Sequence, residues 1–564
     1  MRRTLSLRKL SLLMFAFVFI ALSRGNTFAG PAQIVVVNLN AAGVGFNDPT
    51  PAAPVGGNTG TTLGQQRLIA FQHAATIWGA RLDSAVPIRI RAQFTPLGAG
   101  VLGSAGPVSV VRDFPNAPLS GTWYHVALAN KLTGVDLLPA NDDISANFST
   151  NFNFYLGIDN NHGALPDLVT VLLHEFAHGL GFSQLASLTT GNLFSGFPDA
   201  YNSNLLDTTL GLRWPQMTSA QRLASATRFG RVVWDGPFVT AGVPNVLSFG
   251  SPNVQVTSPA GIAGPYQFGS ASFGPSIGNP NVSANVVAAV DAADAAGPAT
   301  TDGCSAFLNA ADVAGKIALI ERGTCGFALK ARNATDAGAV AVIIYNNAAN
   351  VNAAPPGMAD DGINGQFVTI PTVSIRRADG LAVVAQLGGG VAANIGVDLS
   401  IRAGADSSNR ARVYAPFPVV GGSSISHFDT VASRNLLMEP AINGDLTHKV
   451  KAPDDLTFEL LRDVGWTFPD ADGDGVADDE DCNPNSDLRP TIVIGTVDTG
   501  VPNTLFANGC TSSDLITQLA ASARNHGDFV AAVAQLTNQW VRDGLITGVQ
   551  KGAIENAAAK FRGV

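Results

Sequence analysis

Two histidines and a glutamate in the segment from Val171 to Phe182 have the spacing of a hydrolytic zinc site. Positions i and i+4 share one face of a helix, so His174 and His178 can direct nitrogen atoms at one metal ion, with Glu175 beside them. Zinc lowers the pKa of a bound water from about 15.7 towards about 7, and a neighbouring carboxylate can then accept the proton. The pattern therefore predicts a zinc site in which Glu175 is the general base.

The residues before this motif predict the helix that the zinc site needs. Asp167 follows a proline and is expected to be the N-cap, and a run of apolar residues provides the faces of the helix. The alternative is a buried amphipathic helix with incidental histidines. That alternative is disfavoured because a His-Glu-His cluster within an apolar run would leave several polar groups buried without partners.

The two histidines are an incomplete site, because a catalytic zinc usually has three protein ligands and a water. A glutamate from a following helix is disfavoured, since no glutamate lies between Glu175 and Glu321. In the longer motif HExxHxxGxxH, a glycine lets the chain turn out of the helix so that a third histidine meets the metal. Gly181 fits this motif, but Gln184 stands where the histidine would be, and a neutral amide is a weak zinc ligand. The third histidine is therefore expected elsewhere in the chain.

Far downstream, a Ser-His-Phe segment centred on His427 is followed by a Leu-Met-Glu-Pro segment that contains Met438. Together with the helix motif, these segments resemble the leishmanolysin family of metzincin zinc proteases. In that family the third zinc histidine is separated from the glycine by an insertion and precedes a turn whose methionine packs under the metal site. The resemblance implies that His427 is the third ligand and Met438 the turn methionine. A surface histidine without a metal, and Asp199 or Asp207 as the ligand, remain alternatives.

The N-terminus has a basic start, an apolar run of 13 residues from Leu10 to Leu22 and a small-residue exit at Ala29. This pattern predicts a secretory signal peptide over residues 1–29. No later segment reaches the roughly 20 apolar residues of a membrane span. Removing the signal peptide takes away five basic and no acidic residues, so the net charge of −9 becomes −14, which argues against nucleic acid as a partner. The mature chain is expected outside the cell, with the periplasm or the cell surface as alternatives.

Four cysteines suit two disulfides in an exported protein. Locality favours the pairs Cys304–Cys325 and Cys482–Cys510 among the three possible connectivities.

Composition and pattern predict an α+β protease domain made of residues 30–254 and 405–468. Its first part is expected to contain strands at 34–37, 86–92 and 143–148 and a helix at 63–81. In metzincins an edge strand of this kind lies along the active-site cleft, where a substrate backbone can pair with it.

The intervening residues 255–404 are rich in Ala, Gly, Val and Asn, and the segments 314–327 and 337–347 closely resemble the protease-associated (PA) domain. Such domains are noncatalytic α/β modules of proteases, thought to influence substrate access or partner binding. An inserted PA domain explains the distance in sequence between His178 and His427, because the cost of closing a loop grows only logarithmically with its length.

Residues 469–487 follow a D-x-D-x-D-G-x-x-D-x-x-D pattern, which suits a hard cation that takes six to eight oxygen ligands. The pattern resembles a thrombospondin type 3 calcium repeat, with a solvated acidic linker as the alternative. Residues 488–564 have helical periodicity and no catalytic constellation. The expected Ca²⁺ ligands are Asp470, Asp472, Asp474, Asp478 and Asp481.

The residues and the resemblances together predict a secreted zinc endopeptidase that acts on protein or peptide substrates. The expected fold is a metzincin-like α+β domain interrupted by an α/β PA domain and followed by a calcium repeat and a small helical region. A catalytically inactive adhesion protein on a protease scaffold is the alternative. An exopeptidase is a third possibility, since PA domains also occur with aminopeptidases, but those di-zinc enzymes use ligand patterns absent here.

Overall fold

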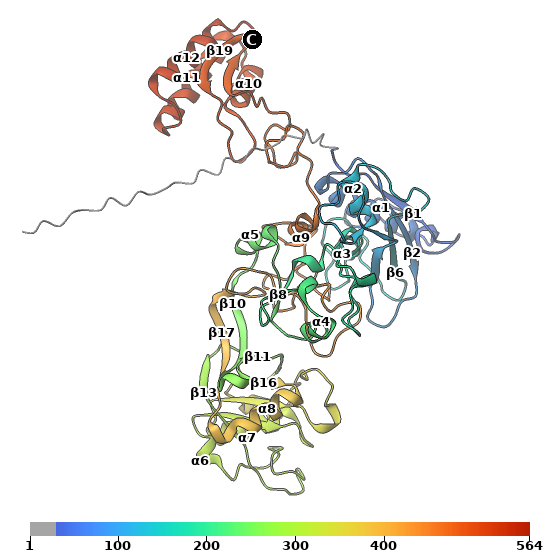
Figure 1. Ribbon diagram of the computed structural model, residues 1–564, viewed down its shortest axis with the longest axis vertical. Coiled ribbons are helices and arrows are strands. Elements are labelled where there is room, and N and C mark those ends of the chain that lie inside the picture. The colour runs from blue at the N-terminus through green and yellow to red at the C-terminus, as the bar shows by residue number, and fades with distance from the viewer. Residues whose placement is uncertain (1–29, 564) are drawn as a thin grey trace, which may run out of the picture. The chain divides into compact units, whose positions relative to one another are not determined.

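The computed structural model describes residues 30–563, so the predicted signal peptide lies outside the described residues. The chain forms two compact units, Gly30–Pro469 and the described part of Asp470–Val564. Figure 1 shows helices and sheets in both units. Within the part of the chain that the structure describes, no helix is long and apolar enough to cross a membrane.

The larger unit begins with a four-stranded sheet whose strands have the order β1-β2-β6-β3 (Figure 1). Three neighbouring strands are parallel, whereas β3 is antiparallel to β6 and forms an edge. Along β2 the inward positions alternate with more exposed ones, as expected for a sheet with one face on the core. The strands are β1 (Ile34–Asn38), β2 (Ile88–Thr95), β6 (Ile144–Ser149) and β3 (Gly103–Pro107).

The strand at the β3 edge of the sheet was not among the predicted strands. The strand expected near residues 143–148 is β6, and it pairs with a neighbour on both sides. The edge strand is β3, which reads Gly-Ser-Ala-Gly-Pro. This sequence has no apolar alternation and two glycines, so it lacks the signals by which a strand is recognised.

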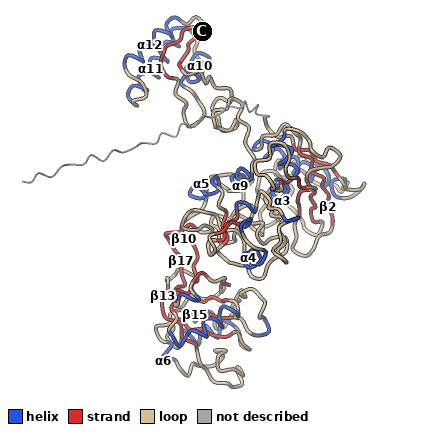
Figure 2. Tube along the Cα trace, in the orientation of Figure 1, coloured by secondary structure: helices blue, strands red, loops and turns tan. Residues whose placement is uncertain are grey.

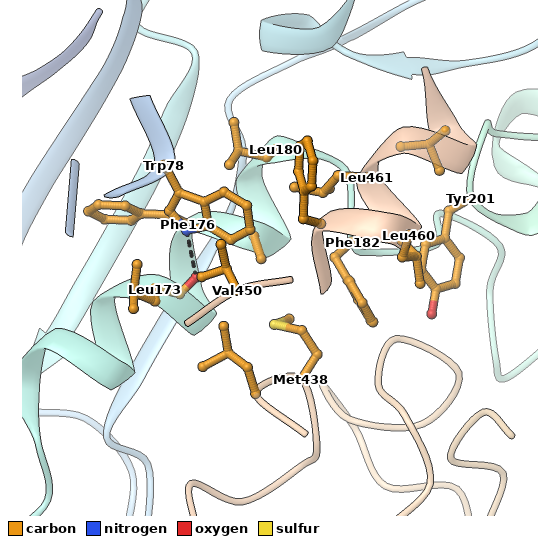
Figure 3. Close-up of a cluster of buried hydrophobic side chains, with 14 of the residues drawn as sticks. Trp78, Leu173, Phe176, Leu180, Phe182, Tyr201, Met438, Val450, Leu460 and Leu461 are labelled. Atoms are coloured by element: carbon orange, nitrogen blue, oxygen red, sulfur yellow. Dashed lines mark hydrogen bonds between the residues drawn. The ribbon is translucent and has the colours of Figure 1, made fainter. Parts of the chain in front are cut away.

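One continuous core joins the sheet, the helices α1 (Leu63–Arg81) and α3 (Leu168–Leu180), and residues near the end of the unit. Every residue of α3 is buried. Figure 3 shows Trp78, whose indole Nε1 donates a hydrogen bond to the Leu173 carbonyl oxygen over 3.1 Å. The same view shows Met438 close to these side chains, together with residues of α9 (Thr457–Val464). Burial on all sides therefore holds α3 in a fixed position.

The PA region contains an eight-stranded sheet with the order β11-β10-β17-β13-β14-β15-β16-β12. Its central strands are parallel, and their side chains alternate between two cores, one on each face. The helix α7 (Phe327–Asp336) contributes to one core and α8 (Arg377–Gln386) to the other. The strands are β11 (Gly264–Pro265), β10 (Phe249–Ser258), β17 (Ala392–Arg402), β13 (Val282–Ala288), β14 (Ile317–Glu321), β15 (Ala341–Tyr345), β16 (Thr372–Ile375) and β12 (Phe268–Ser270).

The chain enters and leaves this region through two paired strands. β10 and β17 are antiparallel neighbours, with Phe249 opposite Arg402. Just outside the pair, the Ala403 amide donates to the Ser248 carbonyl oxygen over 2.9 Å. The insertion therefore begins and ends at one place in the fold.

Between β17 and α9, residues 403–456 form no helix or strand (Figure 2). Backbone hydrogen bonds nevertheless order this segment. The Tyr414 amide donates to the His427 carbonyl oxygen over 2.9 Å, and the Phe428 amide donates to the Met438 carbonyl oxygen over 2.8 Å. A loop-like segment thus has a defined path through the core.

The smaller unit contains a two-stranded hairpin and three helices around its own core. The sequence predicted helices here but not the hairpin, whose strands are only four and six residues long. Both predicted disulfides, Cys304–Cys325 and Cys482–Cys510, are confirmed. The elements of this unit are β18 (Thr491–Ile494), β19 (Val497–Pro502), α10 (Ser512–Ser522), α11 (His526–Arg542) and α12 (Gly548–Lys560).

The other elements of the larger unit are short. They are α2 (Val126–Thr133), α4 (Ser219–Ser225), α5 (Pro237–Val246), α6 (Ala310–Val313), β4 (Val110–Val111), β5 (Tyr124–His125), β7 (Leu205–Asp207), β8 (Leu212–Arg213) and β9 (Val232–Trp234).

Candidate metal centre

Three buried histidines meet at the side of α3. His174 and His178 lie on the helix, and His427 comes from the segment between β17 and α9. The ring centroids are 4.9 Å apart for the two helical histidines, and His427 lies 5.2 Å from His174 and 4.8 Å from His178. One nitrogen atom from each ring lies within 4.8 Å of the other two, so the set can hold one metal ion.

Each of these rings has a backbone partner on its Nδ1 atom. His174 Nδ1 lies 2.8 Å from the Leu437 carbonyl oxygen, and the Nδ1 atoms of His178 and His427 lie 2.7 and 2.8 Å from the carbonyl oxygens of Phe182 and Ser423. A carbonyl oxygen only accepts, so every Nδ1 carries the proton and every Nε2 carries a lone pair. Partners of this kind fix the tautomer and the ring orientation of metal-binding histidines.

The Nε2 atoms of His174 and His427 are 3.3 Å apart. Neither atom carries a proton, so they cannot hydrogen bond to each other. Two ligands at the usual zinc–nitrogen distance of about 2.0–2.1 Å and a tetrahedral angle would lie roughly 3.3–3.4 Å apart. This distance therefore fits two ligands of a tetrahedral zinc ion.

Local sequence explains why α3 begins and ends where it does. Asp167 is the N-cap, and its Oδ2 atom accepts a hydrogen bond from the Thr170 amide over 3.0 Å. Gly181 is the C-cap with a φ of 138°, in a region that favours glycine. The turn at Gly181 brings the Phe182 carbonyl oxygen back to His178. Both ends of the helix thus contribute to the orientation of the site.

Burial controls the protonation of the site. It lowers the pKa of His174 to about 3 and that of His178 to about 4, and it lowers the pKa of His427 well below its ordinary value. The rings are therefore neutral near pH 7, which is the form that binds metal. Burial also raises the pKa of Glu175 to about 8, although a backbone hydrogen bond from Ala105 opposes the shift. A cation held by the histidines would favour the ionised carboxylate.

Glu175 lies directly against the edge strand β3. A Cβ atom added to Gly103 would stand 2.9 Å from both Cγ and Oε1 of Glu175, whereas one added to Gly106 on the same strand would meet nothing within 4 Å. Gly103 therefore permits the close approach of the strand to the carboxylate. The strand β3 therefore runs directly past the Glu175 carboxylate.

Two carboxylates that the sequence did not single out as site residues accept hydrogen bonds from segments that position the histidines. Asp455 Oδ2 accepts a hydrogen bond from the Leu437 amide over 2.7 Å, next to the carbonyl that orients His174. Asp167 Oδ2 lies 2.6 Å from His448 Nε2 in addition to capping α3. Asp167 is far from His448 in sequence, and Asp455 is 18 residues from Leu437, so no local motif predicts these contacts. The capping role of Asp167 is the exception, because it has a local signal.

The alternative ligands lie outside the group. Asp199 accepts hydrogen bonds from the Leu185 and Asn202 amides over 2.8 and 2.7 Å, and Asp207 pairs with Arg228 at 2.7 Å. The backbone amide of Gln184 donates to Ser426 Oγ over 3.4 Å. Gln184 therefore lies beside the segment that carries His427 and does not replace this histidine.

A cavity of about 250 Å³ lies at the N-terminal end of α3. It is lined by Leu102 just before β3, by the loop before α3, by Thr170 one turn ahead of His174, and by residues from Ile442 onward in the segment after Met438. Its walls combine apolar and polar groups.

The predicted calcium ligands are only partly brought together. Asp470, Asp472 and Asp474 have carboxylate oxygens within 4.8 Å of one another. Asp478 is outside this group and accepts a hydrogen bond from the Ala471 amide over 2.7 Å, while Asp481 accepts one from Asn483 over 2.9 Å. Burial raises the pKa of Asp474, and the neighbouring carboxylates of Asp472, Asp481 and Asp470 add to the shift.

Comparison with known proteins identifies one part of the chain. A protein-family model for the PA domain matches residues 282–383, which confirms the predicted PA domain. Over 76 residues the chain is 46% identical to Aminopeptidase YwaD of Bacillus subtilis (strain 168), a stretch that is 14% of this chain and 16% of that protein. Over 87 residues it is 39% identical to ER degradation-enhancing alpha-mannosidase-like protein 3 of Homo sapiens, covering 15% and 9%.

Among solved structures, BSAP, a zinc aminopeptidase from Bacillus subtilis, matches with 28% identity and a TM-score of 0.19, over 28% of this chain and 35% of that one. At this TM-score the likeness says nothing about the fold of the whole chain. The chain spans less than a fifth of the length of the curated relatives that it matches. Since a stretch of this chain also matches a mannosidase-like protein, matches of this length do not define the reaction.

Proposed function

We propose that this protein is a zinc-dependent peptidase whose metal is held by His174, His178 and His427. One nitrogen atom from each of the three rings converges on the same place, and the Nδ1 atom of each ring has a carbonyl partner. This arrangement is the observation that carries the proposal. Oriented, neutral histidines that leave room for a further ligand are typical of catalytic zinc sites. The leishmanolysin-like pattern around His427 and Met438 supports a metzincin type of site.

Zinc, when bound, would polarise the scissile carbonyl and lower the pKa of a water molecule. Glu175 follows His174 on the helix, so its carboxylate can accept a proton from the attacking water and pass it to the departing amine. The carbonyl oxygens of Leu437, Phe182 and Ser423 keep the histidine rings in one orientation throughout.

The finer proposal is an endopeptidase, because the features around the site suit an extended chain. The outer edge of β3 has no partner strand among the described residues and lies beside Glu175. A substrate backbone could pair with this edge by β-augmentation. The cavity near Thr170 and Ile442 would then receive a substrate side chain.

An aminopeptidase is the second candidate, because several curated relatives of the matched stretch have that name. This candidate rests on a small part of the chain, whereas the endopeptidase proposal rests on the site itself. The two differ in whether the free amine of the substrate is required.

The deciding experiment uses the zinc-loaded full chain with two peptide libraries, one with free and one with acetylated N-termini. Mass spectrometry identifies the products, and Glu175→Ala is the control for contaminating proteases. Internal cuts in the acetylated library, made only by the wild type, would support the endopeptidase. Trimming confined to free N-termini would support the aminopeptidase. Zinc binding without any cleavage would instead favour a noncatalytic binding protein.

Two further proposals concern the environment of the enzyme. The predicted signal peptide supports export, and the two disulfides are typical of oxidising compartments. The cluster of Asp470, Asp472 and Asp474 supports a structural Ca²⁺ site in the smaller unit, because oxygen donors at alternate positions suit this hard cation.

A further inference from the structure

A second cavity, of about 320 Å³, lies where the PA region meets the protease domain. One side is formed by residues of β10, β11, β12 and β17, and the other by residues around β9 and by the segment 406–412. The two sides touch at the rings of Phe229 and Phe268, whose centroids are 6.3 Å apart. A cavity of this volume has room for a small ligand.

Three arginines and two aspartates line this cavity. Arg410 is neutralised, because its guanidinium pairs with Asp406 at 2.6 Å. Asp398 accepts hydrogen bonds from the amide and hydroxyl of Ser400 and stays on its own strand. The Asp398 carboxylate and the guanidinium groups of Arg231 and Arg412 remain, so the lining carries an excess of one positive charge.

Neither of these two guanidinium groups has a hydrogen-bond acceptor within residues 30–563. Arg412 Nε is buried without a partner, and among the described residues the Arg231 side chain has no hydrogen-bond or ion-pair partner. The side chains are half-buried, and they repel each other. Burial lowers the pKa of Arg412, Asp429 and Asp406 oppose the shift, and the charge of Arg231 adds to it. Burying a cationic hydrogen-bond donor without an acceptor destabilises the folded protein. A planar guanidinium group can donate two parallel hydrogen bonds to a carboxylate, so a bound carboxylate would satisfy these donors.

The uncharged part of the lining is mixed, with polar side chains such as Asn253 and Gln255 beside a group of apolar and aromatic ones. Phe229, Tyr266, Phe268 and Pro265 contribute ring surfaces, and the Tyr266 hydroxyl is already used as a donor to the Ile262 carbonyl oxygen over 2.9 Å. A ligand that fits this lining carries a carboxylate at one end and an apolar group at the other. We propose that the junction cavity is a binding site for such a carboxylate, with Arg231 and Arg412 as the residues that recognise its charge.

This inference is independent of the peptidase proposal, because its readout is binding. Calorimetric titration of the full chain would use N-acetyl-L-leucine and its neutral isostere N-acetyl-L-leucinamide as probes. We expect the acid to bind and the amide to bind about tenfold more weakly or not at all. Arg231→Gln and Arg412→Gln should each lower the affinity for N-acetyl-L-leucine by about tenfold. Arg89→Gln is the control, because Arg89 forms a surface pair with Asp142, and its affinity for the acid should be unchanged.

Two sources of the carboxylate are separated by a second pair of probes, a peptide with a free C-terminus and the same peptide amidated. Tighter binding of the free peptide than of N-acetyl-L-leucine would identify peptide C-termini as the source, and equal binding would identify small carboxylic acids. Equal affinity for acid and amide would overturn the site. Binding that survives both arginine substitutions but disappears in His427→Ala would place the carboxylate at the metal centre and would also overturn it. If Arg412→Gln does not fold, the test rests on Arg231→Gln, because Arg231 is half-buried and its side chain has, among the described residues, no partner whose loss would destabilise the fold.

Discussion

The Nε2 atoms of His174 and His427 lie 3.3 Å apart although the residues are 253 positions apart in sequence. Each ring is held from behind by a carbonyl oxygen, at Leu437 for His174 and at Ser423 for His427. Two lone pairs at this distance repel unless a cation lies between them. The arrangement is therefore one that a bound metal would stabilise.

We predict that His427→Ala loses the metal and Glu175→Ala keeps it. Removing one of three nitrogen donors leaves two ligands, which is too few for a catalytic zinc site. Zinc content after dialysis should fall from about one ion per wild-type chain to a small fraction in His427→Ala. Activity of Glu175→Ala should fall by about 10²-fold or more with zinc content unchanged.

The control for this comparison is His526→Ala, since His526 lies on α11 of the smaller unit and outside the histidine group. It should keep both zinc and activity. Full zinc content in a folded His427→Ala protein would contradict the assignment of the third ligand.

We predict that Gly103→Ala impairs turnover while Gly106→Ala does not. A Cβ atom at Gly103 would stand 2.9 Å from Cγ and Oε1 of Glu175, so the carboxylate must move, whereas the same change at Gly106 meets open space. A misplaced base lowers kcat, and we expect a loss of about tenfold or more. Steady-state kinetics and zinc content would be measured for both variants, and equal rates would show that Glu175 has freedom to adjust.

The sequence predicted the helical half of the site well, because its signals are local. The N-cap at Asp167, the i and i+4 spacing of the histidines and the glycine at 181 all act within one helix, and α3 has these bounds. The helix expected at 63–81 and the PA domain also agree with the structure and with the family match. Short-range periodicity and a nearby motif were sufficient for these elements.

The rest of the site depends on contacts that leave no periodic pattern. Residues 403–456 form no helix or strand, so the path that carries His427 to α3 could be inferred only from resemblance. The edge strand β3 was missed because glycines replace the apolar alternation of a strand. Asp455 accepts a hydrogen bond from the backbone amide of Leu437, and no sequence motif indicates a contact of this kind.

We predict that the full chain binds Ca²⁺ through the acidic segment of its smaller unit. The carboxylates of Asp470, Asp472 and Asp474 lie close together, and their mutual repulsion is relieved by a cation. Calorimetric titration should give about one site, and Asp472→Asn should weaken it by about tenfold or more. Asp498→Asn, an exposed carboxylate on β19, is the matched control. If Asp472→Asn binds Ca²⁺ with unchanged affinity, the Ca²⁺ site does not include Asp472 and the assignment is wrong.

We predict that Asp167 stabilises the fold in a pH-dependent manner. Burial alone would raise its pKa, but hydrogen bonds from His448 and Thr170 outweigh burial, so the pKa lies below its ordinary value of 3.8. A carboxylate with a lowered pKa in the folded state contributes stability above its unfolded pKa, and this contribution is lost as the pH falls through the folded value. Asp167→Ala should therefore cost about 2 kcal/mol at pH 7 and progressively less below about pH 4.

Urea unfolding of wild type and Asp167→Ala at pH 7 and pH 3, both with EDTA to remove metal effects, would measure this difference. Asp336→Ala is the control, because Asp336 is 65% exposed and its pair with Arg332 spans 3.7 Å. Such an exposed pair contributes little, so its removal should cost less than about 0.5 kcal/mol at either pH. A cost at Asp167 that stays constant from pH 7 to pH 3 would mean that the residue acts through packing alone. If the loss of stability in Asp167→Ala becomes smaller at pH 3, the ionised carboxylate of the N-cap stabilises the helix that carries His174 and His178.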